Sequence, residues 1–138
     1  MKVVLDTNII IDAFAAREPW NTAAENIILL ASKEKLEAVL CASAVTDIYY
    51  ICNKSFKDKT KARQVIVTLL SLFPVADVKK KDLQDALGLH VNDFEDAIVC
   101  ACAKRVDAQY IVTRNTGDFV NSPVPAISPT DFLSKFVI

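Results

Sequence analysis

Four aspartates occupy positions from which carboxylates commonly do chemistry. Asp6 ends the apolar run Val3–Leu5, at the point where apolar spacing changes from that of a buried strand to that of a helix. Asp47 and Asp96 stand in the first turns of two later predicted helices, and Asp118 follows a predicted strand. Because ligands bind outside the carboxyl ends of strands in open α/β sheets, these positions favour a functional site.

Each acid also has a simpler explanation when it is taken alone. Asp, Thr and Asn are good N-cap residues, so Asp6, Thr7 and Asn8 could do no more than begin a helix. Converging carboxylates repel one another, however, and a divalent cation would compensate that repulsion. Oxygen ligands with water in the remaining positions suit Mg²⁺ or Mn²⁺, so we predict a metal site at the four aspartates.

The elements that must position these acids alternate along the chain. Strands are predicted at 3–5, 36–41, 75–78, 109–113 and 125–127; helical patterns occupy 9–14, 22–33, 43–53, 58–72 and 81–87, with two more after Asn92 and Ser128. Parallel strands joined by crossover helices have all their carboxyl ends at one edge of the sheet. The alternation therefore predicts an α/β fold in which acids distant in sequence converge.

Local patterns give sharper expectations for several helices. Thr22–Glu25 has the form of a capping box, and Ser128 followed by proline predicts another helix start. The segment 97–103 is apolar almost all round, so we expect this helix to be buried against the sheet. In the helix 58–72 and just after it, the predicted core stripe consists of Val65, Leu69, Leu72 and Phe73.

Composition limits the class of protein. The chain has 138 residues, of which 52% are hydrophobic, and only two glycines, which suits a single domain over 1–138. No apolar segment approaches the length of a membrane span, and Asp6 interrupts the opening apolar run too early for a signal peptide, so we expect a cytoplasmic protein. The cysteines lack metal-ligand spacing and are predicted to be reduced core residues; they are Cys41, Cys52, Cys100 and Cys102.

Four motifs, in this order, resemble the PIN-domain family of small nucleases, which includes the toxins of VapBC toxin–antitoxin pairs. The motifs are Leu5-Asp6-Thr7-Asn8, Ser43-Ala44-Val45-Thr46-Asp47, Asp93-Phe94-Glu95-Asp96-Ala97 and Thr113-Arg114-Asn115-Thr116-Gly117-Asp118-Phe119. The resemblance implies a three-layer α/β/α fold with a central parallel sheet, a Mg²⁺- or Mn²⁺-dependent site and hydrolysis of RNA. It also implies a homodimer and a small antitoxin partner.

The resemblance assigns roles to particular residues. Asp6, Asp47 and Asp96 match the three principal metal-binding acids of the family, and Asp118 matches the region of the more variable fourth. The second acid is most often Glu in the family, and many members carry an acid where this chain has Asn115. A shorter Asp47 could act through a water molecule, and Asn115 removes one charge but leaves a carbonyl ligand.

Other residues are candidates for holding the substrate or orienting the site. Thr7 and Asn8 could hydrogen-bond to Asp6 or to a metal-bound water, and Arg114 is either a bidentate phosphate ligand or a surface arginine. The only histidine, His90, is predicted to be a solvated loop residue. No histidine is required for phosphodiester hydrolysis, because a divalent metal can activate water and stabilise the developing charge.

Several surface groups have two open explanations. A basic cluster around 54–63 is either a solvated face or a rim that guides the RNA backbone, and Tyr49, Tyr50 and Trp20 could stack on bases. Ile9, Ile10, Phe14 and Trp20 also offer apolar surface that would suit a partner. The alternative function is a PIN-like scaffold that binds RNA or protein without cutting.

Overall fold

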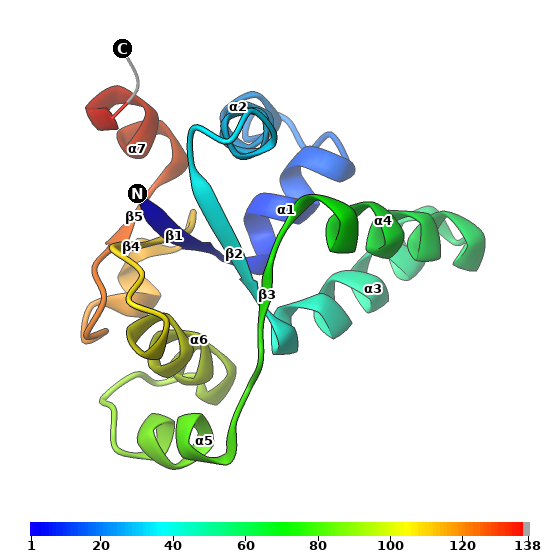
Figure 1. The fold of residues 1–138 in the computed structure, drawn as a ribbon. Helices are drawn as coiled ribbons and strands as arrows, with labels where there is room; N and C mark the ends of the chain where they lie inside the picture. Colours follow the sequence, from blue (N-terminus) through cyan, green and yellow to red (C-terminus); the bar gives the residue numbers. More distant parts are fainter. Residues whose placement is uncertain (137–138) are drawn as a thin grey trace.

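The computed structural model describes residues 1–136, and Figure 1 shows strands covered by helices on both sides. The elements in chain order are β1 (Lys2–Leu5), α1 (Thr7–Phe14), α2 (Asn21–Ser32), β2 (Glu37–Cys41), α3 (Ala42–Phe56), α4 (Lys59–Leu72), β3 (Val75–Ala76), α5 (Lys80–Leu87), α6 (Phe94–Arg105), β4 (Tyr110–Val112), the 3-10 helix η1 (Thr116–Phe119), β5 (Ala126–Ile127) and α7 (Pro129–Phe136).

The five strands form one parallel sheet in the order β3-β2-β1-β4-β5. Strand β1 is central: Leu5 lies opposite Leu40 of β2 on one side and Val112 of β4 on the other. The chain builds outward from β1 to β3 and then returns to the opposite side of β1. The carboxyl end of β1 is therefore the point at which the strand order reverses, where open α/β sheets bind ligands.

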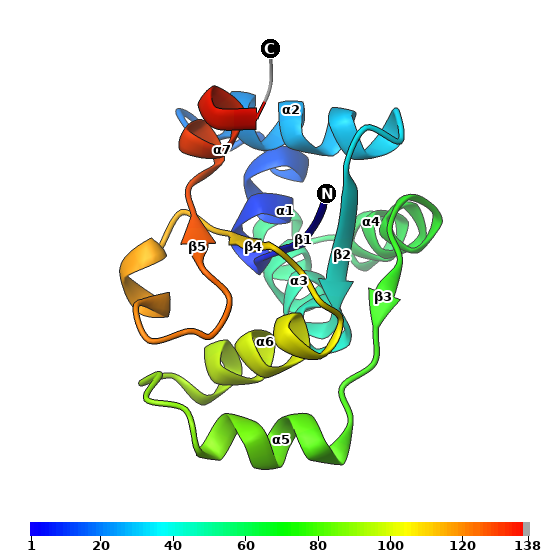
Figure 2. The same cartoon turned by 60° about the vertical axis from the view of Figure 1, so that its left-hand side comes forward.

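Alternate residues of the strands enter two separate cores. Val3 and Leu5 face the core formed with α1, α2, α3, α4 and α7, whereas Val4 and Ile111 face the core formed with α6. In Figure 2, α6 lies directly beneath the sheet, and α5 lies beyond it on the outside. The predicted three-layer α/β/α fold with a central parallel sheet is thus confirmed.

Most helix starts follow the local chemistry of the sequence. Asp58 begins α4 by accepting hydrogen bonds from the N–H groups of Thr60 (2.9 Å) and Lys61 (3.3 Å). The Ser128 hydroxyl caps α7 by accepting from the N–H of Asp131 at 3.1 Å, and Pro129 is the first helical residue, as predicted. Every residue of 97–103 is buried, so the expectation for α6 is also met.

Three local predictions are wrong. Thr22 does not cap α2: the helix begins at Asn21, after a turn in which the carbonyl of Arg17 accepts the N–H groups of Trp20 and Asn21. Because the backbone is already helical at Trp20, no extended residue is available to act as a cap. In α4, Leu72 is 39% exposed and lies outside the core stripe, whereas Ala62 near the start of the helix is buried and belongs to it.

The third error concerns the expected partner surface. Ile9 and Ile10 are fully buried, because α1 is enclosed between the sheet and neighbouring helices. Phe14 packs partly against the same core, and only Trp20 of that group is substantially exposed. The four cysteines are free and buried, as predicted. Between residues 1 and 136, no helix combines the length and the apolar character needed to cross a membrane.

Candidate active site

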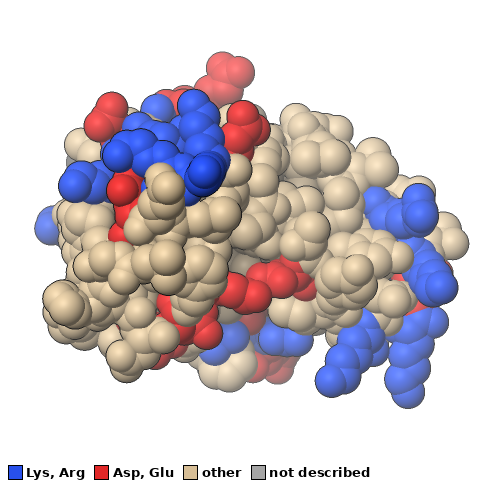
Figure 3. All heavy atoms as spheres, turned by 90° about the horizontal axis from the view of Figure 1, so that it is seen from below, with Lys and Arg blue, Asp and Glu red and all other residues tan. Residues whose placement is uncertain are grey.

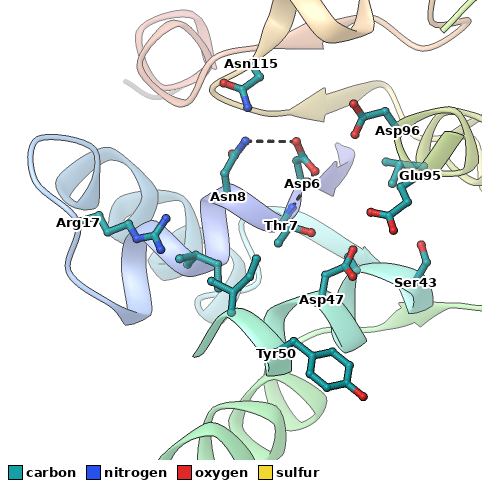
Figure 4. Close-up of a pocket in the computed structure, with 14 residues that line it drawn as sticks. Asp6, Thr7, Asn8, Arg17, Ser43, Asp47, Tyr50, Glu95, Asp96 and Asn115 are labelled. Carbon is teal, nitrogen blue, oxygen red and sulfur yellow. Dashed lines mark hydrogen bonds between the residues drawn. The ribbon is translucent and has the colours of Figure 1, made fainter. Parts of the chain in front are cut away.

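A cavity of about 440 Å³ opens at the carboxyl end of the central strand. Figure 4 shows its lining, with Asp6 from the end of β1, Asp47 from α3 and Asp96 with Glu95 from α6. Thr7, Asn8 and Asn115 also line it, whereas Arg114 and Asp118 do not. The topology thus brings three of the four predicted acids to one cavity, although they are far apart in sequence.

Asp6 is held in place by the elements on both sides of it. Its N–H donates to the carbonyl of Val112 at 3.0 Å, which extends the β1–β4 pairing by one residue. One carboxylate oxygen accepts from the N–H of Thr7 (2.8 Å), and the other accepts from the hydroxyl of Thr113 (2.8 Å) and the amide of Asn8 (3.3 Å). Asp6 therefore begins α1 and also presents a fixed carboxylate to the cavity.

Thr7 and Asn8 contribute in different ways. The contact of Thr7 with Asp6 is made by its backbone, as in an ordinary helix start. The Asn8 amide also donates to Thr113 at 3.3 Å, and its carbonyl accepts the N–H of Arg114 at 3.3 Å. Asn8 thus ties Asp6 to the loop after β4, which is the orienting position expected from the sequence.

Asp96, at the start of α6, and Asp118, in η1, line a second cavity together. Asp93 is the N-cap of this helix, and its carboxylate accepts the N–H of Asp96 at 3.0 Å. Asp118, in η1, lines an adjoining cavity of about 380 Å³ together with Asp93 and Asp96, and the exposed loop residue His90 lies at its edge. Asp96 is common to both cavities, so it connects Asp118 with the main acid group.

The carboxylates have shifted pKa values because they are crowded and partly buried. Burial, followed by the charges of Asp6, Asp93 and Asp118, raises the pKa of Asp96 to about 7. Burial raises the pKa of Asp6 as well, although hydrogen bonds from Thr113 and Thr7 oppose the rise. Burial and crowding therefore favour the protonated forms of these two carboxylates in the metal-free protein.

Glu95 adds a further carboxylate to this group. It stands in the first turn of α6 next to Asp96 and lines the same cavity. The nearby Asp47 raises the pKa of Glu95, and partial burial adds to the effect. The helix dipole alone favours an acid in the first turn of a helix, so the sequence did not single out Glu95 as a residue of the cavity.

These groups fit a divalent cation by their chemistry. Among residues 1–136, no three acid, His or Cys side chains stand close enough to act together as ligands of one ion. Mg²⁺, however, commonly binds through one or two carboxylates and keeps several waters. Asp6 and Asp96 line the same cavity, and burial raises the pKa of both, so these two carboxylates would hold such an ion, with Asp47 on the facing wall of the cavity.

The raised pKa of Asp96 predicts how the metal-free protein responds to pH. Its folded-state pKa of about 7 lies above its usual 3.8, so this group stabilises the fold below pH 3.8, and that stability is lost as pH rises toward 7. In EDTA, the urea midpoint of the wild type should therefore fall relative to that of Asp96→Asn over this range. If the urea midpoints of the two proteins change with pH in parallel, the raised pKa of Asp96 is contradicted.

Arg114 belongs to a buried ion pair. Its Nε and Nη2 donate to the two carboxylate oxygens of Asp12 at 2.5 and 3.1 Å, and Asp12 is fully buried. The Arg114 Cζ also lies 4.0 Å from the centroid of the Trp20 ring. Arg114 is thus not the surface arginine considered above, and its two described side-chain bonds go to Asp12; a direct contact with substrate phosphate stays a prediction.

Thr113 is the other residue of this region that sequence reasoning missed. It is fully buried, and its hydroxyl donates to Asp6 while accepting the N–H of Asn115 at 3.0 Å. Its position at the end of the predicted strand 109–113 was visible in the sequence. Only the pairing of β4 beside β1 places it against Asp6.

Comparisons with known proteins agree with this architecture. The family model described as a PIN domain matches residues 2–117. Ribonuclease VapC1 of Aquifex aeolicus (strain VF5) is 22% identical over 140 residues, covering 98% of this chain and 95% of the relative.

Two solved structures share the fold. VapBC2 from Rickettsia felis, bound to a DNA fragment from its promoter, matches with a TM-score of 0.72 and 20% identity, covering 93% of this chain and 98% of the other. Mycobacterium tuberculosis VapC20, a sarcin–ricin loop cleaving toxin, matches with a TM-score of 0.65 and 15% identity, covering 79% and 86%. With a family match that spans most of its length, the chain belongs to the PIN-domain family.

Proposed function

We propose that this protein is a Mg²⁺- or Mn²⁺-dependent ribonuclease and the toxin of a toxin–antitoxin pair. The observation that carries the proposal is the meeting of Asp6, Asp47 and Asp96 at the switch point of the sheet, with the pKa values of Asp6 and Asp96 raised. The Aquifex relative is a ribonuclease, and the M. tuberculosis toxin of the same fold cleaves the sarcin–ricin loop.

The chemistry follows from the placement of the carboxylates. A bound Mg²⁺ would supply a water of lowered pKa and would offset charge on the phosphate. Asp6, whose carboxylate accepts hydrogen bonds from Thr113 and Asn8, and Asp96, which stands in the first turn of α6, would be the two oxygen ligands of the ion. Asp47 would add a third carboxylate on the facing wall of the cavity that could hold the ion, and Asp118 adds negative charge near Asp96.

The test is cleavage of a mixed RNA pool by purified protein, with Mg²⁺, with Mn²⁺ and with EDTA. We expect products with either metal and none in EDTA, with duplex DNA left intact. Binding of RNA without cleavage under every metal condition would instead support the alternative of a binding module. The same assay with Asp96→Asn excludes a contaminating nuclease, because only cleavage by this protein should be lost in that variant.

Asp47 offers a sharper test of the metal site, because this chain has Asp where the family usually has Glu. Asp47→Asn removes the charge, and we expect it to lower the cleavage rate about tenfold or more. Asp47→Glu keeps the charge and reaches further into the cavity, so it should retain or raise activity at limiting Mg²⁺. The measurement is a Mg²⁺ titration of the cleavage rate for both variants.

The competing explanation makes the opposite prediction for Asp47→Asn. An acid in the early part of α3 that serves the helix alone can be replaced by Asn with little effect, since Asn interacts with helix starts almost as well. An Asp47→Asn protein with wild-type rate and unchanged Mg²⁺ midpoint would remove Asp47 from the site.

We further propose a homodimer and a small antitoxin partner in the cytoplasm. The exposed apolar side chains of α4, Val67, Leu70 and Leu72, support a partner face on this helix. Sedimentation at roughly tens of micromolar should show a dimer. If the wild type sediments as a monomer at that concentration, and Leu70→Lys sediments in the same way, the dimer is refuted.

A further inference from the structure

One side of α3 continues from the acid cavity toward the basic end of the molecule. Ser43, Asp47, Tyr50 and Ile51 of this helix all line the cavity. Ser43, Tyr50 and Ile51 each stand three or four residues from Asp47, so they lie on the same side of the helix, and Lys54 follows Tyr50 and Ile51 by four and three residues. Lys54 lies about 10 Å along the axis from Asp47, at 1.5 Å per residue.

Tyr50 is unusually exposed for an aromatic residue at the edge of a cavity. It is 69% exposed, and Figure 4 shows it next to Asp47. Its ring makes an edge-to-face contact with Tyr49, with centroids 5.5 Å apart, and Tyr49 packs partly against the core. Tyr49 thus supports one side of the Tyr50 ring, and the 69% exposure of Tyr50 leaves the rest of that side chain open to solvent. This is the arrangement needed for stacking on a nucleobase.

Cations lie beyond Tyr50 and on the other side of the cavity. Figure 3 shows Lys and Arg side chains gathered at the right-hand end, where α3 meets α4, with acidic side chains nearer the middle. The basic cluster there consists of Lys54, Lys57, Lys59, Lys61 and Arg63. Within residues 1–136, none of the ion pairs involves Lys54. Arg17 lines the cavity from the loop before α2.

The residues along α3 follow the order acid, aromatic ring and cation. This order matches the alternation of phosphates and bases along a nucleic acid strand. A phosphate beside Asp47 requires a metal, the adjoining base can use a ring face, and the next phosphate can use a lysine. A protein partner would be expected to meet a patch whose centre is depleted of charged residues. The charges along this face therefore favour a nucleic acid strand.

We propose that α3 binds single-stranded RNA, with an unpaired base next to the cleaved phosphodiester stacked on Tyr50 and the following phosphate at Lys54. The proposal rests on the ribonuclease function proposed above and specifies its substrate as an unpaired segment. A duplex is disfavoured, because its bases are already stacked and paired and cannot offer a face to the tyrosine.

Binding tests this proposal separately from cleavage. The anisotropy of a labelled, short, mixed-sequence single-stranded RNA is measured with the full chain in EDTA, where we expect no cutting. Tyr50→Ala should raise Kd about tenfold, whereas Tyr50→Phe, which keeps the ring, should bind like the wild type. The matched control is Leu87→Ala, a side chain of α5 that is 76% exposed and lies outside the cavity lining.

Lys54 is tested through the salt dependence of the same binding. Lys54→Gln should reduce the slope of log K against log salt by about 0.7, the value for one phosphate contact on a single strand. Lys35→Gln, at an exposed lysine in the turn before β2, should leave the slope unchanged. With metal present, Tyr50→Ala should raise KM more than it lowers kcat, since it removes binding and not metal ligands.

The outcomes separate this inference from the proposed function. If the wild type cleaves RNA but Tyr50→Ala has wild-type Kd and KM, the stacking site is refuted and the ribonuclease stands. If single strands bind through Tyr50 but are never cut, the ribonuclease is refuted and the binding face stands. Equal affinity of the wild type for duplex and single-stranded RNA, or loss of partner-protein binding alone in Tyr50→Ala, would overturn the inference.

Discussion

Asp96→Asn should slow RNA cleavage by about two orders of magnitude or more at saturating Mg²⁺, while the protein stays folded. The carboxylate lines both acid cavities, and its pKa of about 7 reflects burial and the charges of Asp6, Asp93 and Asp118. An amide at this position cannot supply the charge that the metal requires. Cleavage rates of the variant and the wild type at matched metal concentrations check the prediction.

The same substitution, Asp96→Asn, should make the metal-free protein more stable although it lowers activity. Without metal, Asn removes the repulsion that ionised Asp96 experiences, so the free energy of unfolding in EDTA above pH 7 should rise. Glu25→Gln, at an exposed acid inside α2 and beyond its first turn, serves as the control and should change neither quantity. A loss of activity accompanied by a loss of stability would indicate damage to the fold and not removal of a ligand.

The largest effect on stability is expected from Asp12→Ala. Asp12 is fully buried and Arg114 is only 22% exposed, so removing the carboxylate leaves a cation without its partner in a poorly solvated position. Breaking such a buried pair costs about 3–5 kcal/mol of unfolding free energy. For a domain of this size, we expect Tm to fall by about 10 °C or more, measured by thermal denaturation.

Two controls identify the ion pair as the cause. Lys81→Ala breaks an exposed pair with Asp85, whose atoms lie 3.6 Å apart, and should change the free energy by less than about 0.5 kcal/mol. Replacing Asp12 by Leu and Arg114 by Met together should recover much of the loss, because no buried charge remains. If Asp12→Ala has the same free energy of unfolding as Lys81→Ala, the Asp12–Arg114 ion pair does not stabilise the fold to the expected extent.

Features that depend on near neighbours could be predicted from the sequence. The uniformly apolar segment 97–103 predicted a buried helix, and Ser128 followed by Pro129 predicted the start of α7. Asp6 was placed after a strand because the apolar period changes at that residue. The failed capping box at Thr22 marks the limit of this reasoning, since the turn before it had already started the helix.

The sequence alone therefore determined the α/β class, the positions of the acids after strands or near helix starts, and their expected convergence. Strand and helix periods and parallel crossovers are governed by local and general rules. Only the tertiary structure decided that Arg114 would pair with Asp12, 102 residues away, and that Thr113 would hold Asp6, 107 residues away. Both contacts exist because β4 lies beside β1, an order set by burial of distant segments that no local pattern records.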